Sequence, residues 1–197
     1  HVHRAEHLAL LEEGIVRQRP VAIGEIGLDL FQSRIDRPGV FEEDLREQEF
    51  FFVEQLKLAK KHDLPVLLHI RRANDQILKH LRRIGVPGGI AHAFNGSMQQ
   101  AEEYMKLGFK FGFGGAFTYG RASRLRKLAQ ELPLESIVLE TDGPDIPPEW
   151  IARQRNEPAE LPRIAQTLAD LRGIGVEEVA ARTTANAVEV LGLKASV

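Results

Sequence analysis

The chain has 197 residues, a formal net charge of -2, 43% apolar and 27% charged residues, and no cysteine. This composition is typical of a globular protein, and no apolar run reaches the roughly 20 residues that span a bilayer. The lack of cysteine excludes disulfides, thiolate metal sites and a cysteine nucleophile, and it favours a reducing, cytoplasmic compartment. With this net charge the chain has no overall positive field that would attract nucleic acid. A few Lys or Arg side chains in a cleft are nevertheless enough to bind a phosphate.

Strands and helices are predicted to alternate along the whole chain. Short apolar runs predict five strands, at residues 21–26, 64–69, 88–94, 109–115 and 137–142. Helical spacing of apolar residues predicts helices at 5–19, 41–62, 74–84, 97–107, 123–131, 159–171 and 176–191, and residues 28–40 read as a long loop. This order points to parallel strands joined by crossover helices in one α/β domain, residues 1–197.

Two architectures fit this alternation of strands and helices. One is an open doubly wound sheet, and the other is a TIM-type (β/α) barrel. The five strand–helix units are too few to close a barrel of eight strands. The pattern of residues by itself leaves both architectures open.

Metal-binding residue types recur where the predicted strands end. The first strand runs into Glu25, the second ends at His69, the third carries His92 near its end, and the fifth ends at Asp142. The carboxyl ends of parallel strands converge on one mouth of a barrel, so these side chains can meet there. Two carboxylates and two imidazoles suit Zn, Mn, Ni or Mg, and Glu25 is placed to bridge a metal pair. Such a pair lowers the pKa of a bound water and clamps the oxygens of a phosphoester.

Each of these residues also has a purely structural interpretation. A histidine at a strand end is more often a hydrogen-bonded structural residue than a ligand, and Asp142 could cap a turn. Glu25 lies between apolar residues, where a carboxylate is costly unless it is paired or binds a metal. Four such coincidences are less probable than one. The other histidines, His7, His62 and His80, lie on predicted helices among charges and are interpreted as solvated.

Other residues near the strand ends are candidates for substrate binding. Arg71 and Arg72 follow His69 and could bind a phosphate, or form a surface charge pair. Ser97 is expected to cap the helix that follows Asn95, whose N-terminus could receive an anion. The glycines of residues 112–115 would let the backbone approach a ligand closely. The last candidates, in a loop that could equally be solvated, are Arg155 and Asn156.

Four blocks of the sequence resemble a known family. They are VAIGEIGLD at residues 21–29, LPVLLH at 64–69, AHAFNGS at 91–97 and LETDGPD at 139–145. In this order they resemble the blocks of the TatD family of metal-dependent deoxyribonucleases, and the likeness runs from about residue 8 to the end. The runs GLDLF at 27–31 and TYGRAS at 118–123 are similar to its YjjV-like branch.

The resemblance implies a fold, a cofactor and an activity. The fold is a TIM-type (β/α)8 barrel of the amidohydrolase superfamily, and the cofactor is one or two divalent metal ions, Mg, Mn, Zn or Ni. The activity is hydrolysis of phosphodiester bonds in DNA, often from the 3′ end, with single-stranded DNA as a candidate substrate. By the same resemblance, Asp142 accepts the proton of the attacking water and the metal ligands are Glu25, His69, His92 and Asp142.

The front of the family pattern is missing from this sequence. Family members begin with a strand that ends in His-x-His, followed by two further βα units, so the five units here correspond to strands four to eight. His1 and His3 precede a helix and align outside that metal arm, and they are interpreted as a chain end or loop. We therefore expect the sequence to be part of a longer protein.

Two other functions are compatible with these residues. Some members of the family remove D-amino acids from tRNA, so the same metal site could cleave a carboxylic ester. A chain without the front metal arm could instead bind metal or nucleic acid without catalysis. Turnover of DNA, turnover of aminoacyl-tRNA, and metal binding without turnover distinguish the three.

Overall fold

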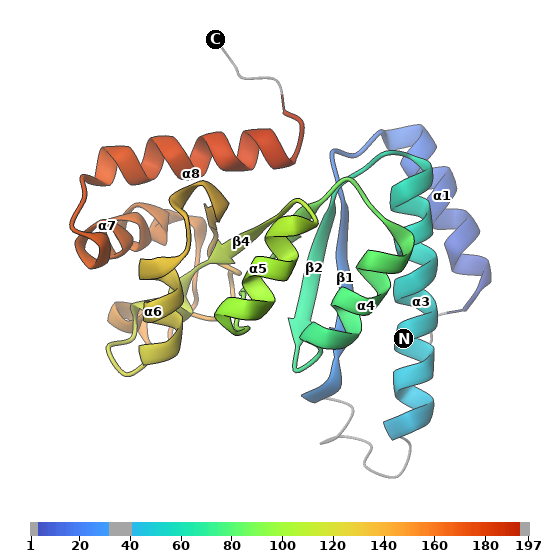
Figure 1. The fold of residues 1–197 in the computed structure, drawn as a ribbon, viewed down its shortest axis with the longest axis horizontal. Coiled ribbons are helices and arrows are strands. Elements are labelled where there is room, and N and C mark those ends of the chain that lie inside the picture. The colour runs from blue at the N-terminus through green and yellow to red at the C-terminus, as the bar shows by residue number, and fades with distance from the viewer. Residues whose placement is uncertain (1–3, 32–40, 194–197) are drawn as a thin grey trace. The chain divides into compact units, whose positions relative to one another are not determined.

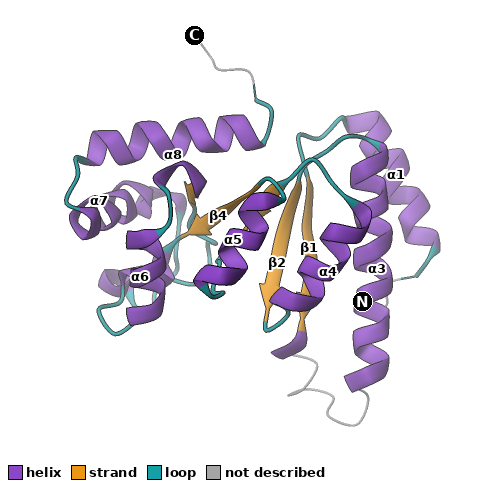
Figure 2. Cartoon of the chain, in the orientation of Figure 1, coloured by secondary structure: helices purple, strands orange, loops and turns teal. Residues whose placement is uncertain are grey.

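The computed structural model describes residues 4–31 and 41–193 (Figure 1). Contacts within the chain divide it into two compact units, the first ending at Gly89 and the second beginning at Ile90. Both units combine helices with parallel strands, so the predicted α/β architecture is confirmed (Figure 2). None of the helices in the described ranges is long and apolar enough to cross a membrane.

In the first unit a parallel pair of strands is covered by helices. Strand β1 (Ile23–Asp29) pairs with β2 (Val66–Arg71), with Leu28 opposite Ile70. The helices of this unit are α1 (Glu6–Gln18), α3 (Phe41–Lys61) and α4 (Asn74–Ile84). Helix α3 packs against β1, and α4 packs against β2 and α3.

The alternation of side chains along β1 and β2 separates a core face from a polar face. Leu28, Val66 and Leu68 are fully buried. Each contributes about 1.5–3 kcal/mol relative to an exposed position. Successive side chains of a strand point to opposite faces, so Glu25 and His69 lie on the other face, away from this core.

In the described part of the second unit, two strands pair in parallel; helices α5, α7 and α8 pack on them, and α6 packs on α7. Strand β3 (Gly89–Ala91) begins at the last residue of the first unit, and β4 (Phe109–Phe113) pairs with β5 (Ile137–Leu139). The helices are α5 (Met98–Lys106), α6 (Ser123–Glu131), α7 (Leu161–Arg172) and α8 (Val176–Val190). Four 3₁₀ turns join them: Gly115–Thr118, Leu134–Ser136, Glu149–Ile151 and Pro158–Glu160.

An aromatic cluster forms the core between α5 and the strands of this unit. The ring centroid of Phe94 lies 4.5 Å from that of Phe111 and 5.8 Å from that of Tyr104. The ring centroids of Tyr104 and Phe109 are also 5.8 Å apart. Helices α7 and α8 pack on each other and on β5. The buried Asn186 of α8 donates its side-chain amide to the carbonyls of Leu134 and Ile137, which ties α8 to the start of β5.

The strand ends differ from the predicted ones by a few residues. Strand β1 continues to Asp29, inside the predicted loop, because Asp29 still pairs with Arg71 of β2; Gln48 of α3 also bonds to its backbone. The Gln48 side chain accepts from the Asp29 N–H at 2.8 Å and donates to the Asp29 carbonyl at 3.3 Å. Strand β2 likewise ends at Arg71, two residues beyond His69.

Two predicted strand positions lie in loops. Strand β3 ends at Ala91 and β5 ends at Leu139, so His92 and Asp142 stand in the segments that follow these strands. Ala93, two residues after β3, and Asp142, three residues after β5, have left-handed φ values of 44° and 59°. These values lie outside the β region, so the predicted strands do not continue through them.

The interpretation of His80 as a solvated residue is wrong. Its exposed fraction is 5%, and its ring packs against Phe52 of α3 with centroids 6.0 Å apart. Nε2 of His80 lies 3.4 Å from the Glu49 carboxylate. His80 is three residues after Ile77, on the buried face of α4, and this helical spacing is a better guide than the neighbouring charges.

Candidate metal centre

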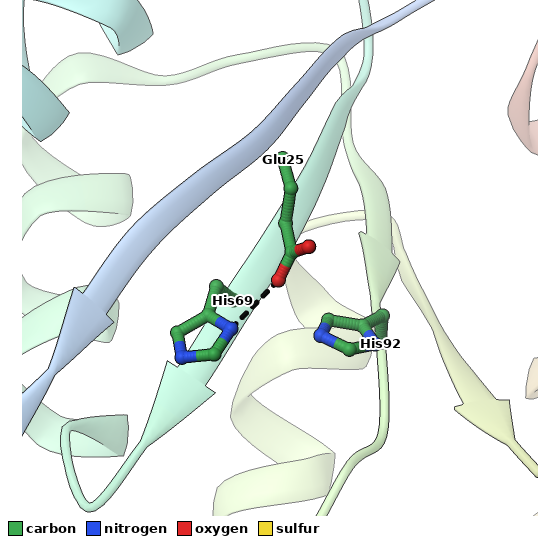
Figure 3. Close-up of side chains that lie close together, drawn as sticks. All are labelled: Glu25, His69 and His92. Atoms are coloured by element: carbon green, nitrogen blue, oxygen red, sulfur yellow. Dashed lines mark hydrogen bonds and ion pairs between the residues drawn. The ribbon is translucent and has the colours of Figure 1, made fainter. Parts of the chain in front are cut away.

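The first group of candidate ligands lies on the polar face of β1 and β2. The Glu25 carboxylate oxygen is 2.6 Å from Nδ1 of His69, a contact drawn as a dashed line in Figure 3. Their side chains are 47% and 37% exposed, so both are open to solvent and to a ligand. On the other side of the ring, Nε2 of His69 lies 3.5 Å from the Asp29 carboxylate. A carboxylate and an imidazole this close can share one divalent cation.

A basic and aromatic cluster follows these residues at the carboxyl ends of the strands. The guanidinium groups of Arg71 and Arg72 lie 4.1 Å and 4.5 Å from the ring centre of Phe31. Arg71 also lies 3.6 Å from the Asp29 carboxylate. An aromatic ring attracts a guanidinium over its face, so both cations are held near the end of β2.

The second group of candidate ligands lies in the second unit, after β3 and β5. The carboxylate of Glu140 accepts a hydrogen bond from the Ala93 N–H at 2.6 Å and lies 3.7 Å from Nδ1 of His92. It reaches this position above Gly112 of β4, where an added Cβ would overlap the carboxylate. The histidine and the glutamate therefore form a pair that spans the neighbouring strand.

Asp142 lies on a loop that one buried residue holds in place. Asn156 is 1% exposed, and its side-chain amide donates to the carbonyls of Thr141 at 2.6 Å, Asp145 at 2.8 Å and Ile146 at 3.1 Å. Within the loop, the Asp145 N–H donates to the carbonyl of Asp142 at 2.9 Å. These bonds on both sides of Asp142 restrict its backbone.

Backbone strain accompanies the candidate ligands. Arg72, Ala93 and Asp142 have φ values of 58°, 44° and 59°. Residues other than glycine rarely adopt this left-handed region, and such residues cluster at functional sites because surrounding contacts maintain them. Here the hydrogen bond of Ala93 to Glu140 and the loop around Asn156 are such contacts.

The donor chemistry of the predicted ligands fits a divalent metal. Carboxylate and neutral imidazole are the ligands of Zn, Mn and related ions, and Glu25, His69 and His92, drawn in Figure 3, offer one carboxylate and two imidazoles. Within the first unit Glu25 and His69 are in direct contact, and within the second His92 is paired with Glu140. The role of these residues and of Asp142 as ligands stays a prediction.

The predicted substrate residues occupy different environments. Ser97 caps α5, since its hydroxyl accepts from the Gln100 N–H at 3.1 Å, as predicted. Asn95 is exposed and accepts a hydrogen bond from Arg124. Asn156 is buried and holds the Asp142 loop, whereas Arg155 is exposed. His1 and His3 lie outside the described residues.

Two acidic residues of this region were missed by the sequence analysis. Asp29 contacts the ring of His69, and Glu140 contacts that of His92. Each stands inside one of the four sequence blocks, next to a strand end, which is the signal that could have identified it. The glycines of residues 112–115 were predicted to let a ligand come close to the backbone. At Gly112 the Glu140 side chain lies in that space.

Comparisons with known proteins identify the family of the chain. The family model described as TatD related DNase matches residues 1–192. The uncharacterized metal-dependent hydrolase YjjV of Escherichia coli K12 is 43% identical over 181 residues, which are 90% of this chain and 67% of YjjV. Human deoxyribonuclease TATDN3 is 37% identical over 174 residues, 88% of this chain and 61% of TATDN3.

The fold agrees with this assignment. The crystal structure of Escherichia coli YjjV, described as a TatD homolog, matches with a TM-score of 0.88 at 39% identity, over 98% of this chain and 72% of YjjV. The sequence blocks, the parallel α/β architecture and the carboxylate–imidazole chemistry at the strand ends agree with one another. The chain therefore belongs to the TatD related DNase family, a family of metal-dependent hydrolases.

Proposed function

We propose that the chain contributes to a metal-dependent deoxyribonuclease that hydrolyses phosphodiester bonds of DNA. The observation that carries this proposal is the 2.6 Å contact between Glu25 and His69 at the solvent-open face of two parallel strands. A relative that is 37% identical is named a deoxyribonuclease, which supports the substrate. In this proposal the five strands belong to a (β/α)8 barrel, with the site at its carboxyl-terminal mouth.

Four residues hold one or two divalent cations in this proposal: Glu25, His69, His92 and Asp142. When bound, such a cation makes a water more acidic and offsets the negative charge that develops on the phosphoryl oxygens. The chain supplies the ligands from separate elements, β1, β2 and the loops after β3 and β5. Carboxylates and histidines in this ratio leave Mg, Mn, Zn and Ni as candidate ions.

Asp142 acts as the proton acceptor in the proposed reaction. The oxygen of a water forms a bond to phosphorus, and the proton of that water passes to the Asp142 carboxylate. The bond between phosphorus and the sugar oxygen breaks, and solvent protonates the leaving oxygen. The hydrogen bonds of Asn156 to the loop keep Asp142 in a fixed orientation, which proton transfer requires.

Arg71 and Arg72 bind the DNA backbone in this proposal. Packing of both guanidinium groups on Phe31 leaves their N–H edges available for a phosphate while it restricts their motion. Guanidinium groups bind phosphates through paired hydrogen bonds.

Nuclease activity with a matched pair of variants tests the proposal. The substrate is fluorescent single-stranded DNA with Mn²⁺, and the variants are Asp142→Asn and Asp145→Asn, which lie on the same loop. We expect Asp142→Asn to lower the rate by about 10²–10⁴-fold, as for loss of a general base, and Asp145→Asn to stay near wild type. Equal rates for wild type and Asp142→Asn would reject the assignment.

Assays of D-aminoacyl-tRNA cleavage and of metal binding, run beside the nuclease assay, separate the alternative functions. Cleavage of D-aminoacyl-tRNA without cleavage of DNA would replace the phosphodiester by a carboxylic ester as the substrate. Stoichiometric metal binding without turnover of either substrate would point to a binding protein. Both outcomes contradict the deoxyribonuclease proposal while they keep the metal ligands.

A further inference from the structure

Glu140 takes a path that only a glycine in the neighbouring strand permits. Its N–H donates to the Phe113 carbonyl at 3.2 Å, which keeps the start of its side chain beside β4. From there the carboxylate lies above Gly112, at a place where any Cβ would collide with it. An alanine at residue 112 would therefore displace the carboxylate.

The Glu140 carboxylate lies between the Ala93 N–H and the His92 ring, both in the segment after β3. It accepts from the Ala93 N–H at 2.6 Å and lies 3.7 Å from Nδ1 of His92. The side chains of His92 and Glu140 are 17% and 21% exposed, so water screens their interaction only partly. The Phe94 N–H donates to the Gly112 carbonyl at 3.2 Å, which fixes this segment to the same strand.

We propose that Glu140 is a positioning residue that orients His92 for metal binding, an inference that rests on the proposed function. A neutral imidazole carries one proton, on Nδ1 or on Nε2. A carboxylate beside Nδ1 favours the proton there, which leaves the Nε2 lone pair for a cation. Metal-binding histidines commonly donate their second nitrogen to such a carboxylate, which also raises their basicity.

The alternative is that Glu140 only anchors the backbone of Ala93. That role requires an acceptor oxygen but no charge, so a glutamine could fulfil it through its own carbonyl oxygen. The effect on His92 does require the charge, because a neutral amide stabilises a proton on Nδ1 much less than a carboxylate does. Glu140→Gln therefore separates the two roles.

The first measurement is made on the metal-free protein by ¹⁵N NMR of the histidine rings. His92 is assigned by comparison with His92→Gln. We expect the proton on Nδ1 in the wild type, and a shift toward the Nε2 form in Glu140→Gln. A wild-type His92 with its proton on Nε2 overturns the inference, and so does an unchanged proton position in Glu140→Gln.

The second measurement is Mn²⁺ affinity by calorimetry, with Glu131→Gln on the surface of α6 as the control. We expect Glu140→Gln to bind about 10–100-fold more weakly, as for loss of the carboxylate partner of a metal-binding histidine, and Glu131→Gln to bind as the wild type. Gly112→Ala, which displaces the carboxylate but keeps its charge, is expected to weaken binding similarly. Unchanged affinity in both Glu140→Gln and Gly112→Ala overturns the inference.

The two measurements also keep this inference separate from the proposed function. A wild-type protein that binds no divalent metal contradicts the proposed function, while the position of the His92 proton still decides whether Glu140 orients the ring. If Glu140→Gln does not fold, the wild-type proton position and Gly112→Ala provide the test.

Discussion

Asn156 is a buried side chain that shapes the loop around Asp142. Its amide nitrogen donates to three loop carbonyls, those of Thr141, Asp145 and Ile146. Its position in the loop after the last predicted strand also made it a candidate for substrate binding, a role that stays a prediction. Its burial and its bonds point first to an effect on the orientation of Asp142.

Replacement of Asn156 by alanine is therefore expected to affect both stability and activity. Loss of the amide leaves carbonyl groups of the loop without their donor, at a cost of about 1–3 kcal/mol in the free energy of unfolding. We expect nuclease activity to fall further than this loss of folded protein explains, because Asp142 is no longer held. The measurements are urea unfolding and initial rates, with Gln130→Ala, which removes an exposed amide side chain of α6, as control. Unchanged stability and rates in Asn156→Ala would contradict this role.

For single residues, the sequence predicted the candidate metal ligands better than it predicted the side chains that contact them. Glu25 and His69 were expected to meet because parallel strands end on one side, and their contact confirms this. The link from Glu140 to His92 was not foreseen, because it depends on a missing side chain at Gly112. This contact depends on how β4 and the segments after β3 and β5 are placed in the fold, which no short sequence pattern specifies.

Between elements, an ion pair connects α1 to α3. Glu12 of α1 accepts from Lys61 at 2.6 Å and lies 3.0 Å from Nε2 of His62. The hydrogen bond from Lys61, and next that from His62, hold the pKa of the Glu12 carboxyl below its ordinary value. A lowered pKa in the folded state stabilises the fold above the ordinary pKa, and this contribution is lost as the pH falls through the lowered value.

Glu12→Gln tests this contact through its pH dependence. At neutral pH we expect a fall in Tm of no more than about 2 °C, since the pair is exposed to solvent. The difference between variant and wild type should narrow as the pH falls below the ordinary pKa of a glutamate and through the lowered pKa of Glu12. Thermal unfolding over this range is the measurement, with Glu6→Gln on the same helix as control. A difference that grows toward acid pH would contradict the assignment.

Helices were predicted more closely than strand ends. Helices α4 and α6 have the predicted bounds, because an amphipathic stripe repeats over several turns within one segment. Strand ends depend on partners elsewhere. Pairing with Arg71 of β2 extends β1 to Asp29, and the left-handed residue Ala93 lies two residues after the end of β3.

For the whole molecule, the proposed metal centre predicts a linkage between metal binding and folding. Glu25 and His69, which lie 2.6 Å apart, supply two of its proposed ligands. A cation held by these side chains binds the folded chain in preference to the unfolded one. Metal binding should therefore stabilise the fold.

Thermal unfolding with and without Mn²⁺ measures this linkage. At a free metal concentration 100 times the Kd, we expect a gain of about 2.7 kcal/mol, which raises Tm by about 5–10 °C in a chain of this size. A chelator should reverse the shift, and His69→Gln should abolish it. The same shift in His69→Gln would place the stabilising metal elsewhere.

The sequence predicted that parallel strands alternate with helices along the chain. Alternating strand and helix patterns indicated parallel strands with crossover helices, and the strand pairs confirm this. A closed eight-stranded barrel and a single domain remain predictions. Both depend on contacts between units, which no local pattern of residues specifies.

The most direct test of the metal centre is anomalous diffraction from crystals grown with Mn²⁺. We expect an anomalous peak at about 2.0–2.3 Å from ligand atoms of at least three of four side chains. These side chains are Glu25, His69, His92 and Asp142. A peak coordinated by other residues, or no peak under conditions that support turnover, would contradict it.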